Sequence, residues 1–458
     1  MSVRAVRRHP PFLDQARQQA LDILADREEG LVSLTLPAPA GLVPKVPAGL
    51  TDFRFLARPS EGLALLGHRQ AAKLRARGPG RFGALADFLA RAGEAWRHGD
   101  PAATGLRPRA FVGFSFAAGG GLTAIDLLPE AEIVVPAVLL QNHGGTTAFT
   151  FTARPGGRRS AEAIADSWIA GAAEVMDRLT RVPDRSPAGP LRRLDSEPED
   201  AVWLARVGRA LTDIRAGRLD KVVLTRRLRV VADRPFEPSV IMDRLAERHG
   251  ACTLFALADD SVTAVGATPE RLVALEGRQV RSDALAGTLP LGPSSRPDEK
   301  DRHEHRLVAD AILSALRPVC EELDYPPHPR LLRLSSLQHL WTPVTGRARP
   351  GVSLLDLAAR LHPTPAVGGS PYRVAMDWLA HEGERRIGWY TGGIGWVDAE
   401  GDGDIAVVLR CAALNGDTAI LSAGAGIVAG SDPKAELAET ELKLATMLDA
   451  LGGAPDGR

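Results

Sequence analysis

The chain has 458 residues, 45% of them hydrophobic, which is enough for one large domain or two ordinary ones with a substantial core. Lys plus Arg and Asp plus Glu both number 56, so the chain has no net basic field of the kind that attracts nucleic acid. Local groups must therefore hold any charged ligand.

The three cysteines have no metal-ligand spacing, which argues against a disulfide framework and for a reducing compartment. The apolar runs are too short for a membrane span, and the arginine-rich N-terminus lacks the uninterrupted apolar core of a signal peptide. We therefore expect a cytoplasmic protein, a monomer, with no membrane and no nucleic-acid partner.

The N-terminal part, residues 1–190, alternates short apolar runs with turn residues. Residues 31–36 and 110–116 have the alternation or β-rich composition of strands, and residues 82–96 and 161–179 read as helices. This part is informative about the fold but poor in chemically distinctive residues. We interpret it as an N-terminal α/β part of the fold.

Residues 181–200 are rich in proline and charge, which predicts an exposed connection. We place a boundary there, with a C-terminal part over residues 196–455. Ser196 and Glu199 have the spacing of a capping box and predict that a helix begins at this point. A β-branched run follows, and we expect a strand with Lys221 at its start.

Three further segments of the C-terminal part carry residues of interest. Glu270 follows a Thr-Pro pair where the chain enters a predicted strand. Residues 298–317 predict an amphipathic helix with Lys300 and Glu304 on one side. Residues 361–371 contain three prolines and two glycines, so we expect a turn-rich loop that cannot be helical.

The C-terminal segment combines a hairpin, glycines and a charged helix. Asn415 and Gly416 lie between two apolar runs and predict a hairpin, which would place Arg410 on a paired strand. Gly424 and Gly426 would leave main-chain N–H groups uncovered in a turn ahead of the helix, an arrangement that suits a bound carboxylate. Steps of three and four then put three charges on one helical face: Glu436, Glu439 and Lys443. Taken alone, such a face is as often a solvated surface as a site.

Nine motifs over residues 200–450, taken in order, resemble those of the chorismate-utilising enzymes. They are KVVLTR at 221, GATPERL at 266, LAGT at 285, EKDRHEH at 299, LHPTPAVGGSP at 361, GWYTGGIGW at 388, LRCA at 409, AGAGIV at 423 and ELAETELK at 436. That family includes isochorismate synthase, salicylate synthase and the large components of anthranilate and aminodeoxychorismate synthase. The resemblance implies a single large α/β (α+β) fold, in which helices flank two layered, mainly antiparallel sheets and the active site lies in the C-terminal part.

Individual positions discriminate among the members of this family. The aminodeoxychorismate enzymes carry a nucleophilic lysine where this chain has Ala286, and the anthranilate synthases typically carry glutamine where it has Lys221. The lysine implies water as the nucleophile and no glutaminase subunit. Many relatives have arginine where this chain has Leu289 and Leu291. Some have an acid where it has Arg306, which could alter the charge near the metal. The resemblance thus implies magnesium-dependent isomerisation of chorismate to isochorismate, with water attacking ring carbon 2 and the 4-hydroxyl leaving.

By this resemblance, Lys221 is the base for water and Glu270 the general acid for the departing hydroxyl. These roles need a lowered pKa for the lysine, from burial or from Arg226 or Arg227, and a raised pKa for the glutamate. Three carboxylates would hold Mg²⁺: Glu304, Glu436 and Glu439. The residues expected to bind chorismate are Gly287, Thr288, His339, Ala366, Tyr390, Arg410, Gly424, Gly426 and Lys443.

Other functions stay open. A salicylate synthase shares the lysine base and eliminates pyruvate from isochorismate; Ala366 and Val367, with the glycine pair after them, favour stopping at isochorismate. An anthranilate-synthase-like enzyme is a further alternative. From another class, the alternative is a non-catalytic chorismate-binding module, against which the filled base and acid positions argue. The product could feed menaquinone or siderophore biosynthesis.

Overall fold

The computed structural model describes residues 11–25, 29–119, 128–156, 159–186, 188–259, 262–292, 296–334 and 337–452. Within these ranges none of the helices combines the length and the apolar character needed to cross a membrane. The α-helices of the described residues are α1 (Pro11–Leu24), α2 (Arg81–Glu94), α3 (Ala161–Thr180), α4 (Asp200–Arg215), α5 (Pro238–Arg248), α6 (Glu299–Leu316), α7 (Leu354–Leu361), α8 (Tyr372–His381) and α9 (Pro433–Leu451).

The strands of the described residues all belong to one hydrogen-bonded network. They are β1 (Leu31–Pro37), β2 (Phe53–Arg58), β3 (Leu63–Ala76), β4 (Trp96–Gly99), β5 (Arg109–Phe114), β6 (Ala131–His143), β7 (Thr146–Ala153), β8 (Arg192–Glu197), β9 (Lys221–Val231), β10 (Thr253–Asp259), β11 (Val262–Thr268), β12 (Arg271–Glu276), β13 (Gln279–Pro290), β14 (Cys320–Asp324), β15 (Arg330–Arg333), β16 (Leu337–Ala348), β17 (Gly369–Ser370), β18 (Gly393–Asp398), β19 (Gly403–Val407), β20 (Cys411–Asn415) and β21 (Thr418–Val428).

Strand β6 is the branch point of this network. One edge of β6 pairs with β3, and the other edge is shared between β5 and β7. From β3 one arm continues through β2, β10, β11, β20 and β21 to β9, and from β5 a second arm continues through β18, β19, β12 and β13 to β16. The pairings along both arms are antiparallel. The predicted α/β fold with layered antiparallel strands is confirmed, and the two layers are joined through β6.

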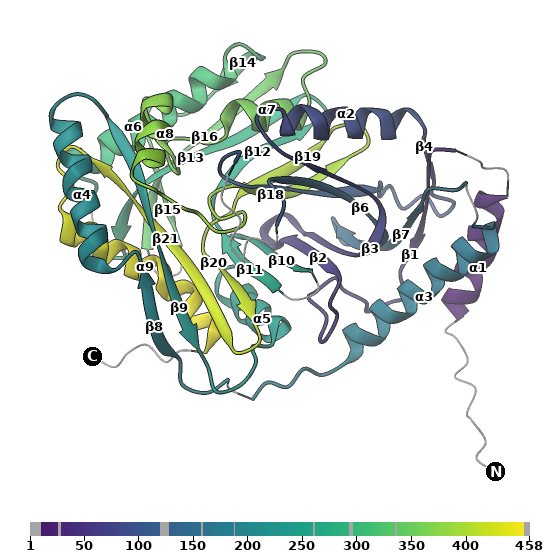
Figure 1. The fold of residues 1–458 in the computed structure, drawn as a ribbon. Helices are drawn as coiled ribbons and strands as arrows, with labels where there is room; N and C mark the ends of the chain where they lie inside the picture. Colours follow the sequence, from purple (N-terminus) through teal and green to yellow (C-terminus); the bar gives the residue numbers. More distant parts are fainter. Residues whose placement is uncertain are drawn as a thin grey trace.

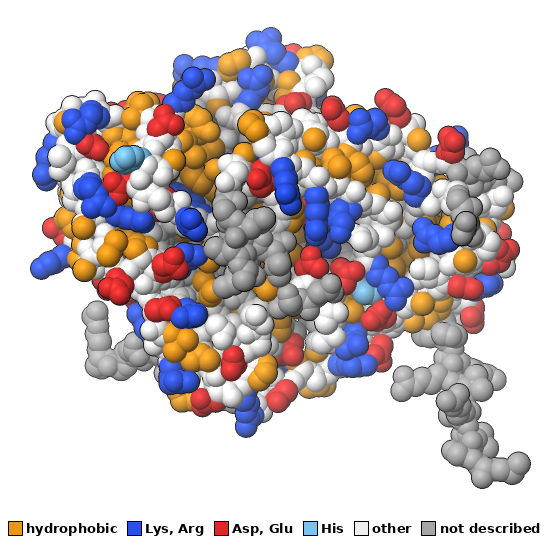
Figure 2. Space-filling model, viewed as in Figure 1, with side chains coloured by type: hydrophobic (Ala, Val, Ile, Leu, Met, Phe, Trp, Pro, Cys, Tyr) orange, Lys and Arg blue, Asp and Glu red, His pale blue; other side chains and the backbone are white. Residues whose placement is uncertain are grey.

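Helices flank the strands on their outer sides (Figure 1). One large apolar core contains Leu85 of α2, Val308 of α6 and Leu357 of α7. A second core contains Trp168 of α3 and Met447 of α9. Because β2 pairs with β10 and β5 pairs with β18, the sheet crosses the boundary expected near residue 190 without a break. On the face drawn in Figure 2, acidic and basic side chains are interspersed, as the balanced composition leads one to expect.

Helix α6 begins at a capping box that sets the position of its first turn. The Asp298 side chain accepts from the Asp301 backbone N–H at 2.8 Å, and the Asp301 side chain accepts from the Asp298 backbone N–H at 3.1 Å. Such reciprocal bonds satisfy donors that the helix itself leaves unpaired. Lys300 and Glu304 follow one turn apart on this fixed end, which confirms the predicted helix.

Several local predictions were wrong. Ser196 lies in β8, which pairs with β9, so residues 181–200 are not wholly a connection, and α4 begins after Glu199 without a side-chain cap. Arg410 is not on a strand: it lies in a bend before β20 with φ of 47°. Gly424 and Gly426 lie within β21 rather than in a turn. In each case tertiary pairing, which local sequence does not encode, decides the conformation.

Candidate active site

A cavity of ≈ 740 Å³, open solvent at its mouth included, lies between the ends of the two arms, where β9 and β21 approach β13, β16, α6 and α9. Twelve of the fourteen residues predicted for the site line this cavity. They are Glu270, Gly287, Thr288, Glu304, His339, Ala366, Tyr390, Arg410, Gly424, Gly426, Glu439 and Lys443. The other two, Lys221 and Glu436, are not part of the lining. Lys221 forms an ion pair with the lining residue Glu304, and Glu436 forms one with Lys300.

Lys221, the first residue of β9, is fully buried and lies behind Glu304 of α6. Its Nζ is 2.9 Å from Oε1 of Glu304. Burial alone would raise the pKa of Glu304, but the ammonium group brings that pKa below its ordinary value. The opposite strand is glycine at this point because a Cβ at position 426 would lie 2.3 Å from Oε1 of Glu304 and 2.8 Å from Cε of Lys221. The ion pair thus occupies the space that Gly426 leaves.

The arginines after Lys221 on β9 are engaged elsewhere. Arg226 donates to Glu441 and Asp200, at 2.8 and 2.9 Å, and Arg227 forms an ion pair with Glu197. These carboxylates neutralise both guanidinium groups. The contacts therefore give no support to the expectation that Arg226 or Arg227 acts on Lys221. The nearest charged partner of Lys221 is Glu304.

Glu270 lies immediately before β12, on the cavity wall, with 4% of its surface exposed. Burial and, to a smaller extent, the neighbouring carboxyl of Asp283 raise its pKa to about 8, against the opposing effect of Lys221 and Lys443. Glu270 is therefore protonated at neutral pH. Asp283 could not be predicted from the sequence, because its burial among the strands of the second arm depends on the fold.

Arg410 and His339 form a polar wall of the cavity. Nη2 of Arg410 lies 3.0 Å from Nε2 of His339, and Nδ1 of His339 lies 3.4 Å from Oγ1 of Thr288. Burial and the charge of Arg410 keep the pKa of His339 well below its ordinary value, so the ring is neutral. Since a guanidinium only donates, Nε2 accepts and the ring proton is on Nδ1. The histidine thus fixes one edge of the Arg410 fork.

Lys443 and β21 provide a second polar wall. Nζ of Lys443 is 2.7 Å from Oε1 of Glu439 and donates to the carbonyl oxygen of Gly424 at 2.8 Å. The carbonyl of Gly424 therefore points away from β9. Within a strand the N–H and C=O of one residue point to the same side, and residues two apart repeat that direction. The N–H groups of Gly424 and Gly426 consequently point away from β9 too, toward the cavity side.

The three acids predicted to bind metal are each paired with a lysine. Glu304 pairs with Lys221, Glu439 with Lys443, and Glu436 with Lys300 at 2.5 Å between Oε1 and Nζ. Among the described residues no three metal-binding side chains stand close enough together to form a coordination site. Burial and the charge of Glu439 raise the pKa of Glu436, which shows that the carboxylates crowd one another.

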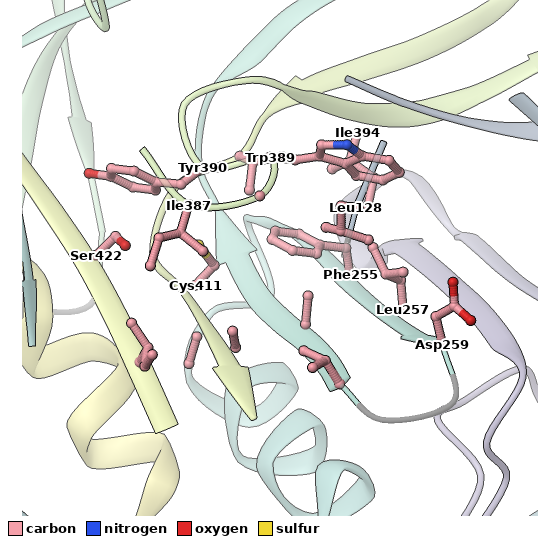
Figure 3. Close-up of a pocket in the computed structure, with 17 residues that line it drawn as sticks. Leu128, Phe255, Leu257, Asp259, Ile387, Trp389, Tyr390, Ile394, Cys411 and Ser422 are labelled. Carbon is pink, nitrogen blue, oxygen red and sulfur yellow. The ribbon is translucent and has the colours of Figure 1, made fainter. Parts of the chain in front are cut away.

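An apolar pocket adjoins the cavity and shares Tyr390 and Ser422 with it (Figure 3). Phe255, Leu257 and Trp389 supply much of its lining. Tyr390 is buried, and burial raises the pKa of its hydroxyl above the ordinary value. The uncharged Tyr390 side chain therefore lies between the polar cavity and the apolar pocket.

The fold and this site define a class of protein, the chorismate binding enzymes. The model of the chorismate binding enzyme family matches residues 19–452, and the chain belongs to that family. It is 35% identical over 338 residues to isochorismate synthase MenF of Bacillus subtilis, covering 72% of this chain and 71% of the relative. It is 41% identical over 289 residues to the salicylate biosynthesis isochorismate synthase of Pseudomonas aeruginosa, covering 60% of each.

The fold is also that of a solved relative. The structure of MenF, the menaquinone-specific isochorismate synthase from Escherichia coli, superposes with a TM-score of 0.76 at 22% identity, covering 96% of this chain and 99% of that one. At this identity the likeness concerns the fold. It extends over the N-terminal part, where the sequence motifs are sparse.

Proposed function

We infer that this protein is an isochorismate synthase, an isomerase that converts chorismate to isochorismate. The observation that carries the inference is a single cavity with a protonated, buried acid on one wall and a buried lysine behind another. Relatives over most of the chain are named for the same activity. The proposed substrate, chorismate, is a dianion, and Arg410 and Lys443 supply positive charge on the cavity wall.

The isomerisation exchanges a hydroxyl at ring carbon 4 for one at ring carbon 2. Glu270, protonated at neutral pH, would deliver a proton to the departing 4-hydroxyl oxygen. Lys221 would take a proton from the attacking water, for which it must first lose its own proton and its pairing with Glu304. Arg410, oriented by His339, would hold a substrate carboxylate, and the N–H groups of Gly424 and Gly426 would add donors.

The donor set fits Mg²⁺, a hard cation that prefers carboxylate oxygens. Glu304, Glu436 and Glu439 would hold it. Burial and the charge of Glu439 raise the pKa of Glu436, and a divalent cation would relieve this repulsion between the two carboxylates. When bound, the metal would neutralise these acids and receive a substrate carboxylate. We propose no glutaminase subunit, since the base position is a lysine.

The test is to incubate the purified protein with chorismate and Mg²⁺ and to follow the products by chromatography. We expect isochorismate and no release of pyruvate. Stoichiometric pyruvate with salicylate would instead identify a salicylate synthase, and anthranilate formed with added ammonia would identify an aminating enzyme. Binding of chorismate without turnover would identify a non-catalytic module and overturn the proposal.

A further inference from the structure

Lys300 occupies a position among the three acids of the proposed metal site. It lies one helical turn before Glu304 on α6, and its Nζ is 2.5 Å from Oε1 of Glu436 on α9. Burial would lower the pKa of Lys300, but Glu436, Glu304 and Glu439 together raise it above the ordinary value. All three carboxylates therefore act on one ammonium group.

The three lysines of the cluster differ in how firmly they are held. Lys221 is fully buried, and Lys443 has a second bond to the carbonyl of Gly424. Lys300 keeps 23% of its side chain exposed, and Glu436 is its ion-pair partner among the residues that the structure describes. A long side chain with one partner and access to solvent can swing outward. Lys300 is thus the lysine that can leave.

Glu436 cannot follow it, because only 2% of its side chain is exposed. A buried carboxylate without a positive partner is strongly unfavourable. If the ammonium of Lys300 leaves, another cation has to take its place. Because the charges of Glu304 and Glu439 also act on the ammonium group of Lys300, a divalent ion is better matched to the total charge of the three acids than a single ammonium.

We propose that Lys300 is a resident counter-cation of the Glu304, Glu436 and Glu439 cluster, which a divalent metal must displace, so that Lys300 sets the affinity of the site for metal. The inference rests on the metal site of the proposed function and adds a residue to it. Lys300 acts through Glu436 and is a positioning residue. The exchange keeps the cluster neutralised whether or not metal is bound, and no covalent step is involved.

The central test measures Mg²⁺ binding by calorimetry without chorismate. In Lys300→Met the competing ammonium is gone, and we expect Mg²⁺ to bind about tenfold more tightly or better. The matched control is Lys434→Met, which removes one positive charge from an exposed position of α9, near the cluster in sequence. If charge alone mattered, both variants would tighten binding equally, and this result would overturn the proposal.

Thermal unfolding gives a second readout. Without metal, Lys300→Met leaves Glu436 buried and unpaired, so we expect a lower Tm and a larger rise of Tm on adding Mg²⁺ than in the wild type. In a Glu436→Gln background the same substitution should change the metal-free Tm much less, because its partner charge is absent. If Lys300→Met does not fold, Lys300→Arg, which keeps the positive charge, is measured in its place.

Lys300→Arg, which keeps the positive charge, is expected to bind Mg²⁺ no more tightly than the wild type. Unchanged or weaker Mg²⁺ binding in folded Lys300→Met overturns the proposal, as does the absence of Mg²⁺ binding in both proteins. The assay is independent of turnover. A wild type that forms isochorismate while Lys300→Met shows no tightening refutes only the role of Lys300, and tightening in a protein that forms no isochorismate refutes only the proposed function.

Discussion

Nζ of Lys221 lies 2.9 Å from Oε1 of Glu304, although the two residues are on different elements and 83 positions apart in the chain. The pair is possible because Gly426 leaves room for it. It joins the proposed base to the proposed metal site. To act as a base, Lys221 would have to be free of its pairing with Glu304 and hold an unprotonated amine.

Replacing Lys221 with alanine should abolish isochorismate formation, with a loss of roughly 10²–10⁴-fold or more, because general-base catalysis disappears. The cavity wall formed by Arg410 and Lys443 is untouched, so chorismate binding with Mg²⁺, measured by calorimetry, should persist. The metal-free protein should have a lower Tm, since Glu304 loses its buried partner. Near wild-type turnover would remove the lysine from the mechanism.

The raised pKa of Glu270 predicts a loss of activity at alkaline pH. Its pKa is raised to about 8, so the acid form required for proton delivery declines as the pH rises through that value. We expect kcat/KM to fall on this limb and Glu270→Gln to be inactive at every pH. A limb that persisted in a residually active Glu270→Gln would assign the titration to another group.

The same group affects stability with a definite sign. In the unfolded chain Glu270 ionises near 4.5, whereas in the fold it stays protonated up to about 8, so the folded state binds more protons between these values. Stability contributed by this group is complete below pH 4.5 and is lost as the pH rises toward 8. Relative to Glu270→Gln, the wild type should lose unfolding free energy across this range, measured by denaturant titration.

Much of the site could be predicted from the sequence because the motifs are short local runs. The helical spacing of Glu436, Glu439 and Lys443 and the strand containing His339 required no knowledge of the fold. Tertiary relationships were not accessible in this way. The bend at Arg410 is stabilised by its carbonyl, which accepts from the N–H of Ala267 on another strand.

The role of Lys300 shows the same limit. Its place on one side of α6 with Glu304 followed from helical periodicity, but its partner Glu436 lies on α9, more than a hundred residues away. A charged helix face on its own is compatible with solvent. Only the approach of α6 and α9 to the end of β21 distinguishes a buried cluster of opposite charges from an exposed surface.

Asp283 provides a test of how the acid is tuned. Its carboxyl contributes to the raised pKa of Glu270, so Asp283→Asn should lower that pKa and move the alkaline limb of kcat/KM to lower pH. The amide can still accept from Nε1 of Trp341, as the carboxylate does at 2.8 Å, which preserves local structure. A limb at the wild-type pH in a folded variant would show that burial alone tunes Glu270.

Gly426→Ala tests whether the space at β21 sets the geometry of the ion pair. The added Cβ would lie 2.3 Å from Oε1 of Glu304, so Glu304 and Lys221 must move, and overpacking of this kind costs about 1–3 kcal/mol of stability. We expect kcat to fall at least about tenfold, because displaced catalytic groups lose their alignment. Mg²⁺ binding should weaken as well, since Glu304 is a proposed ligand.

The matched control for this substitution is Gly208→Ala on α4, where a Cβ would meet nothing within 4 Å. Alanine is the better helix former by about 0.8–1.0 kcal/mol, so this variant should be at least as stable as the wild type and fully active. Thermal unfolding and steady-state kinetics on both variants separate the effects. If Gly426→Ala kept wild-type kcat and Mg²⁺ affinity, the Lys221–Glu304 pair would tolerate displacement. A glycine at position 426 of β21 would then not be needed to preserve the geometry of the pair.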